Sequence, residues 1–132
     1  MSFLLNHDTC RAWLRHNRLV QARCLQHQNG VCIAAPTIFE LAMWMLRPHV
    51  PFRVQLGYYT FMQHLQVVNL DRNLAERAAV VSASSLRAGI RLSSVELMMI
   101  ATAIEGGLTL VTHDAQRYAN IPGLTLVDWM VP

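Results

Sequence analysis

The stretch from residue 93 to residue 118 constrains the fold more than any other part of the 132-residue chain. It opens with two serines, which commonly cap helices, and continues as an apolar run up to the Gly106-Gly107 pair, which ends a helix. The next segment, 108–111, is short, apolar and followed by polar residues, as in a buried strand of a parallel sheet. The stretch therefore predicts a helix, a tight turn and a strand that leads to Asp114.

The rest of the chain alternates between short apolar segments and helical segments in the same way. We expect further strands at 3–5, 31–34, 67–70 and 124–127. We expect the other helices to begin near Thr9 and to cover 17–28, the segment from Pro36 to about 46, 52–65 and 71–88. Strands that alternate with helices pair in parallel through right-handed crossovers. The predicted fold class is α/β, a three-layer α/β/α sandwich with a central parallel sheet of four to five strands.

Length and composition indicate one domain, residues 1–132, with an unusually apolar surface. Hydrophobic residues make up 53% of the chain and charged residues only 14%, so we expect a partner to cover part of the surface, either a second copy or a dedicated binding protein.

No segment is long enough to span a bilayer and no signal peptide is evident, so we expect a cytoplasmic protein without membrane association. The net charge of +3 permits a nucleic-acid partner without demonstrating one. The odd number of cysteines argues against a disulfide framework and favours free thiols at Cys10, Cys24 and Cys32.

Four of the eight acids fall where a parallel sheet brings element ends together. Asp8 follows the first strand, and Glu40 lies one turn into the helix after the second. Glu96 begins the helix before the fourth strand, and Asp114 follows that strand. Ligands of open α/β sheets bind beyond the carboxyl ends of the strands. Clustered carboxylates without basic partners repel one another unless a hard cation such as Mg²⁺ or Mn²⁺ neutralises them, so the pattern predicts a metal site.

Each of these acids also has a purely structural interpretation. Thr37-x-x-Glu40 and Ser93-x-x-Glu96 both match the capping box, in which the Glu accepts a hydrogen bond from the backbone of the capping residue. Asp8 and Asp114 could each cap a helix or favour its first turn. Their shared placement at one edge of the sheet favours a joint site over four independent caps.

The chain resembles a PIN domain, specifically a toxin of the VapC type from bacterial toxin–antitoxin pairs. The resemblance covers nearly the whole chain, in the blocks FLLNHDTC, APTIFELAMW, SSVELMMIATAI, LTLVTH and IPGLTLVDW, of which the last two are the most specific. It implies a parallel α/β/α sandwich and Mg²⁺-dependent endoribonuclease activity. It also implies a cognate antitoxin whose tail wraps the toxin and keeps it inactive.

By position, the resemblance implies a catalytic and metal-binding site made of Asn6, Glu40, Glu96 and Asp114. Two of these residues depart from the family pattern, which has Asp at the first and third positions. Asn6 removes one formal charge, so we expect weaker metal binding and reduced activity. Glu96 keeps the charge but lengthens the arm, which disturbs alignment. Asp8 would partly replace the missing charge if the first strand extended that far.

The implied function is that of a ribonuclease toxin that cleaves single-stranded or loop RNA with a metal-activated water. Thr112 and His113 are supporting candidates that could position the water or the phosphate, although a loop His that faces solvent or only forms hydrogen bonds is the commoner case. The alternative is a catalytically silent PIN-like protein that binds RNA or an antitoxin without cleavage. A purely structural subunit would bind neither metal nor RNA. The apolar composition also leads us to expect a homodimer.

Overall fold

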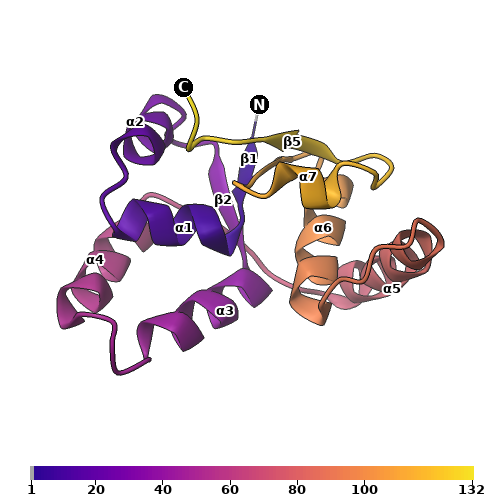
Figure 1. The fold of residues 1–132 in the computed structure, drawn as a ribbon, viewed down its shortest axis with the longest axis horizontal. Helices are drawn as coiled ribbons and strands as arrows, with labels where there is room; N and C mark the ends of the chain where they lie inside the picture. Colours follow the sequence, from indigo (N-terminus) through magenta and orange to yellow (C-terminus); the bar gives the residue numbers. More distant parts are fainter. Residues whose placement is uncertain (1) are drawn as a thin grey trace.

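The computed structural model describes residues 2–132 and contains a five-stranded parallel sheet with helices on both faces (Figure 1). The strands are β1 (Phe3–Leu5), β2 (Val31–Ala34), β3 (Gln66–Val68), β4 (Thr109–Val111) and β5 (Thr125–Val127). The helices are α1 (His7–Leu14), α2 (Arg18–Gln26), α3 (Ala35–Met45), α4 (Phe52–Met62), α5 (Arg72–Arg87), α6 (Ser94–Gly106) and α7 (Ala115–Tyr118). The predicted α/β/α sandwich is confirmed, and its sheet has the larger of the two expected strand numbers.

The order of the strands places a topological switch at the centre of the sheet. The order is β3-β2-β1-β4-β5, so the chain runs outward from β1 in one direction and from β4 in the other. β1 and β4 pair in parallel, with Leu4 opposite Leu110 and Leu5 opposite Val111. Open α/β sheets bind ligands at such a switch, beyond the carboxyl ends of the two strands. This topology directs attention to the segments that follow β1 and β4.

Neighbouring residues of the central strands point to opposite faces and build two cores. Leu5, Ile33 and Val111 pack in a cluster with side chains from α1, α2, α3 and α4. Leu4 and Leu110 pack in a second cluster with side chains from α5, α6 and α7. In Figure 1 these two sets of helices lie on opposite sides of the strands. Because β1 and β4 are buried on both faces, they read in the sequence as continuous apolar runs.

Several predicted boundaries differ from the structure by a few residues. The first helix begins at His7 rather than near Thr9, because the Asn6 side chain accepts a hydrogen bond from the His7 backbone N–H and so caps the helix. The third strand covers Gln66–Val68, and Leu70 lies outside it and is exposed. The predicted free thiols are confirmed, since Cys10, Cys24 and Cys32 are all unpaired and buried.

Within residues 2–132, no helix combines the length and the apolar character that a membrane crossing requires.

Candidate active site

A pocket of about 260 Å³ lies at the topological switch. Its lining comes from the segments after β1 and β4, from α3 and from the start of α6. The lining residues are Asn6, His7, Asp8, Glu40, Glu96, Asp114, Arg117 and Tyr118. The structure therefore brings the four acids singled out in the sequence, and Asn6 with them, to the wall of one pocket.

Asn6 joins β1, α1 and β4 at the base of this pocket. Its side chain is buried, and its Oδ1 accepts a hydrogen bond from the His7 backbone N–H at 2.7 Å. Its Nδ2 donates to Thr112 Oγ1 at 3.2 Å, and its backbone N–H donates to the Val111 carbonyl at 2.9 Å. An Asp at this position would keep the helix cap but would lose the bond that Nδ2 donates.

Asp8 lies in the first turn of α1, so the expectation that an extended first strand would carry it beside Asn6 is wrong. The chain turns into a helix directly after Asn6, which ends the strand alternation. The Asp8 carboxylate instead accepts hydrogen bonds from the Thr9 backbone N–H at 2.6 Å and from the His113 backbone N–H at 3.0 Å. It therefore ties the start of α1 to the end of β4 as well as contributing negative charge to the pocket.

Thr112 is a buried polar residue that organises the wall of the pocket. Its hydroxyl donates to Asp8 Oδ2 at 3.0 Å and accepts from Asn6 Nδ2 and from the Asp114 backbone N–H at 3.1 Å. One donor and two acceptor positions are all that a hydroxyl group offers, so this residue is fully used. Thr112 thus holds three of the residues that line the pocket, Asn6, Asp8 and Asp114.

Glu40 has no capping role, so that alternative is wrong for this residue. The N-cap of α3 is Ala34, and Thr37 lies inside the helix with its buried Oγ1 unpartnered among residues 2–132. Glu40 Oε1 is instead 4.0 Å from His7 Nδ1. Burial lowers the pKa of His7, and Glu40 acts in the opposite direction. The carboxylate of Glu40 therefore lines the pocket beside an imidazole whose burial disfavours its charged form.

Glu96 does have the capping role, and it also has an ion-pair partner that the sequence did not reveal. Ser93 and Glu96 form a reciprocal capping box at the start of α6. The same carboxylate accepts hydrogen bonds from Arg117 Nε at 2.8 Å and Tyr118 Oη at 2.7 Å. Partial burial raises the pKa of Glu96, but the bonds from Arg117, Tyr118 and the Ser93 backbone outweigh it and lower the pKa to about 2. The premise that the clustered acids lack a basic partner is wrong for Glu96.

Arg117 and Tyr118 line the pocket, although the sequence analysis did not single them out. The hydrogen bond to Glu96 raises the pKa of Arg117, whereas burial is the first cause that raises the pKa of Tyr118, followed by its bond to Glu96. Their position in α7, directly after Asp114, was the available signal. Arg117 and Tyr118 follow Asp114 by three and four residues, which is about one helical turn, so they return to the same side of the chain as Asp114.

Asp114 occupies the N-cap position of α7, but its side chain makes no capping hydrogen bond. The residue is exposed, so its carboxylate is open to the pocket. His113 points elsewhere, because its Nδ1 lies 2.9 Å from Asp128 Oδ2 and its side chain lines a neighbouring pocket. The geometry therefore gives no support to His113 as a general base inside the acidic pocket.

The oxygen donors of the pocket are of the kind that a hard cation takes, although not all of them are free. Among residues 2–132, no three His, Cys, Asp or Glu side chains converge closely enough to enclose one ion. Mg²⁺ usually keeps several waters and is bound by only one or two carboxylates. Glu40 and Asp114 meet that requirement, since neither carboxylate is used for capping, whereas Glu96 is already neutralised by Arg117. The donor set fits a water-rich Mg²⁺ site.

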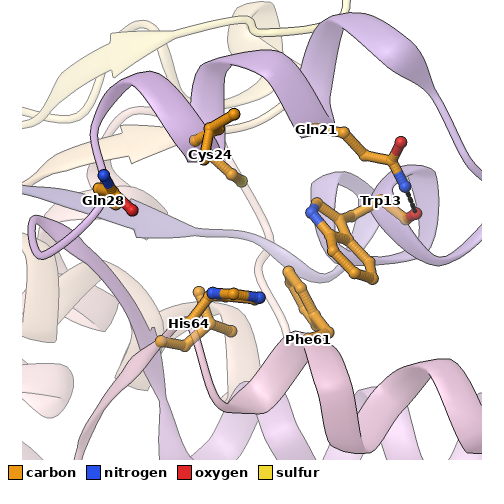
Figure 2. Close-up of a pocket in the computed structure, with 8 residues that line it drawn as sticks. Trp13, Gln21, Cys24, Gln28, Phe61 and His64 are labelled. Carbon is orange, nitrogen blue, oxygen red and sulfur yellow. Dashed lines mark hydrogen bonds between the residues drawn. The ribbon is translucent and has the colours of Figure 1, made fainter.

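A second pocket, of about 290 Å³, has a different character. It lies between α1, α2 and α4, where Figure 2 shows Trp13, Cys24, Phe61 and His64 around it. A hydrogen bond from Gln21 Nε2 to the Trp13 carbonyl at 3.2 Å fixes one side. No carboxylate lines this pocket. It lacks the groups needed for phosphodiester chemistry, so the acidic pocket is the candidate active site.

Comparison with known proteins agrees with the fold and with the resemblance noted in the sequence. The protein tRNA(fMet)-specific endonuclease VapC of Salmonella typhimurium (strain LT2) is 24% identical over 130 residues, which cover 98% of each chain. The protein of the same name from Shigella flexneri is 23% identical over an equal span. The resemblance to VapC-type toxins noted in the sequence is thereby confirmed.

Solved structures and a family model extend the comparison. DNA-bound VapBC from Salmonella typhimurium superposes with a TM-score of 0.88 at 24% identity, covering 98% of each chain. VapBC2 from Rickettsia felis, bound to a promoter fragment, gives 0.89 at 17% identity and covers 98% of this chain and 99% of that one. The PIN domain model matches residues 6–124, which is most of the sequence and spans every residue of the acidic pocket. The chain belongs to the PIN domain family.

Proposed function

We propose that this chain is a metal-dependent endoribonuclease and the toxin of a toxin–antitoxin pair. The observation that carries the proposal is the acidic pocket at the switch between β1 and β4 in a PIN domain. Its similarity to proteins named tRNA(fMet)-specific endonuclease VapC supports RNA as the substrate, with tRNA as the first to test. Single-stranded or loop regions are the preferred targets, because their backbone is accessible. We place the reaction in the cytoplasm.

Glu40 and Asp114 would hold the divalent cation, Mg²⁺ or Mn²⁺, with Asn6 and Glu96 as further donors. The cation would supply a more acidic bound water and would neutralise charge on the phosphate. The chain itself supplies the alignment. Thr112 holds Asn6, Asp8 and the backbone of Asp114 in fixed relation through one hydroxyl group. Small displacements in such a site cost large factors in rate, so this fixed relation favours catalysis.

Two features support a reaction slower than that of a site with four free carboxylates. Asn6 brings an amide in place of a charge, and its Oδ1 is used to cap α1. Glu96 is held by Arg117 and Tyr118, so it must exchange these partners before it can bind a cation. We propose that Asn6 and Glu96 both weaken metal binding.

The proposed partners are a cognate antitoxin and a second copy of the chain. Relatives solved as VapBC complexes support the antitoxin. Helices α3 and α4 also expose large apolar side chains, which a homodimer would bury. These are Phe39 and Met43 on α3, Leu46 directly after it, and Phe52, Leu56 and Tyr59 on α4.

Cleavage of purified bacterial tRNA tests the proposal. We expect fragments to appear with Mg²⁺ or Mn²⁺ and to disappear with EDTA. Glu40→Gln should reduce the rate by at least roughly tenfold, as losses around metal sites do. Glu76→Gln is the matched control, because Glu76 lies on α5 and pairs with Arg72 at 3.6 Å, away from the pocket. Cleavage that persists in EDTA, or that ignores Glu40→Gln, would refute the proposal.

A catalytically silent protein that binds RNA or an antitoxin is the second candidate. It is favoured by the missing acid at Asn6 and by the Glu96–Arg117 pair, which balances one of the remaining charges. RNA binding without cleavage in Mg²⁺ and in Mn²⁺ would select this candidate.

A further inference from the structure

A basic pocket adjoins the acidic one and shares Asp8 with it. It measures about 350 Å³ and is lined by Asp8, Arg11, Ala12, Arg15, Asn17, His113 and Met130. Asp8 lines both pockets, and its carboxylate accepts the His113 backbone N–H. A ligand that extends from the acidic pocket past Asp8 therefore enters the basic pocket.

Arg11 lies in the last turn of α1 and Arg15 directly follows the helix, and both are held by an aromatic ring rather than by carboxylates. Their guanidinium carbons lie 5.6 Å and 5.1 Å from the centre of the Trp44 ring, within cation–π range. Neither forms an ion pair among residues 2–132, whereas Arg72, Arg77 and Arg117 each do. Stacking on Trp44 restrains both guanidinium groups and leaves them without an ion-pair partner among the described residues, so their N–H donors are available to an anion.

His113 also lines the basic pocket. Its Nδ1 lies 2.9 Å from Asp128 Oδ2, and Asp128 is itself fixed by the Met130 backbone N–H at 2.8 Å. The side chain is 56% exposed, so the imidazole is oriented by Asp128 while part of it remains open to a ligand. Because Nδ1 of His113 faces the Asp128 carboxylate, Nε2 is the ring nitrogen that can form a hydrogen bond with a ligand.

We propose that this pocket binds the phosphate group next to the scissile one along the RNA strand. The inference rests on the proposed function, because it assumes that RNA occupies the acidic pocket. The arginine fork matches phosphate oxygens, and the pocket offers two such forks beside an imidazole. The carboxylates of Asp8, Glu40 and Asp114 line the acidic pocket and repel RNA, so a cationic subsite next to them offsets that repulsion.

A strand of RNA fits this surface better than an acidic protein segment does. Phosphates recur along RNA, so one ligand can occupy the acidic and basic pockets at once. Arg15 and Trp44 also line a further pocket with Arg53 and His49, which continues the basic surface away from the acidic pocket. The regularly spaced phosphates of an RNA strand match this row of neighbouring basic pockets.

The test is the salt dependence of RNA binding in Arg15→Gln. The probe is a short fluorescein-labelled single-stranded RNA in EDTA, read by fluorescence anisotropy, so that neither cleavage nor metal occupancy affects the result. Each phosphate contact in a single strand contributes about 0.7 to the slope of log K against log salt. We expect Arg15→Gln to reduce the slope by about 0.7 and the affinity by roughly two- to fivefold at low salt. Arg15→Lys keeps the charge and should keep the slope.

Arg72→Gln is the matched control, because it removes the same charge from α5 on the other face of the sheet. Equal slopes for Arg15→Gln and Arg72→Gln would overturn the proposal. An unchanged RNA affinity with weaker binding of poly-L-glutamate would also overturn it and assign the pocket to an acidic protein segment. Arg15 is exposed, so its replacement leaves the core intact. Absence of Mg²⁺-dependent cleavage would refute the proposed function without altering this binding experiment.

Discussion

Replacing Glu96 by Gln separates the two roles of this side chain. Gln can still accept the Ser93 backbone N–H, because the capping box accommodates either residue. It cannot form the ion pair with Arg117. The difference in unfolding free energy between wild type and Glu96→Gln therefore measures the charged contacts of Glu96, with Arg117 and with the Tyr118 hydroxyl group, with little contribution from the cap.

The magnitude follows from the pKa of Glu96. A value of about 2 in place of the ordinary 4.5 corresponds to about 3 kcal/mol, at ~1.4 kcal/mol per pKa unit. Arg117 is 40% exposed, so solvent screening reduces the expected contribution to about 1–2 kcal/mol. Because the pKa is lower in the folded protein, this stability is present above about pH 4.5 and is lost as the pH falls towards 2.

Urea unfolding of both proteins across this pH range is the assay. We expect Glu96→Gln to be less stable by about 1–2 kcal/mol near neutral pH and the difference to vanish towards pH 2. Glu105→Gln, which removes a pair with Arg77 on an exposed surface, should change little. A difference that is the same at every pH, or no difference at neutral pH, would refute the reasoning.

Three further predictions concern the base of the pocket and the exposed surface. Asn6→Asp should raise the Mg²⁺-dependent cleavage rate, roughly tenfold, because it restores a charge near the cation; an unchanged or lower rate would show that Asn6 is not a lost ligand. Thr112→Val should lower the free energy of unfolding by about 1–3 kcal/mol in urea titrations, because Asp8 and Asn6 each lose a partner, whereas Thr112→Ser should retain most of the stability. Leu56→Glu on α4 should convert a dimer to a monomer in light scattering, and a dimer that persists would place the interface elsewhere.

The fold was predictable because its central strands, β1, β2 and β4, are buried on both faces. In the sequence, β2 and β4 are short apolar runs. The helix before β4 is bounded by recognisable cap residues, Ser93 at its start and Gly107 at its end. Gly107 has a φ of 62°, a conformation that favours glycine and ends α6. The helix start at His7 was missed because an Asn cap and the end of a strand look alike in the sequence.

The acidic pocket was predictable in its membership but not in its electrostatics. Glu40 and Asp114 both follow carboxyl ends of parallel strands, so they lie at the same edge of the sheet in any conformation of the loops. The ion pair between Glu96 and Arg117 depends on how α7 packs against α6, and a separation of 21 residues carries no periodic signal. The use of the Asp8 carboxylate by Thr112 and His113 is likewise a tertiary contact.

Mn²⁺ titration by calorimetry tests most directly whether the acidic pocket holds a cation. We expect the wild-type protein to bind Mn²⁺, and Glu40→Gln and Asp114→Asn each to weaken binding by at least roughly tenfold while the melting temperature stays close to that of wild type. Glu76→Gln on α5 should bind as wild type does. A wild-type protein that binds no Mn²⁺, or one whose binding survives both substitutions, would contradict a metal site at the switch between β1 and β4.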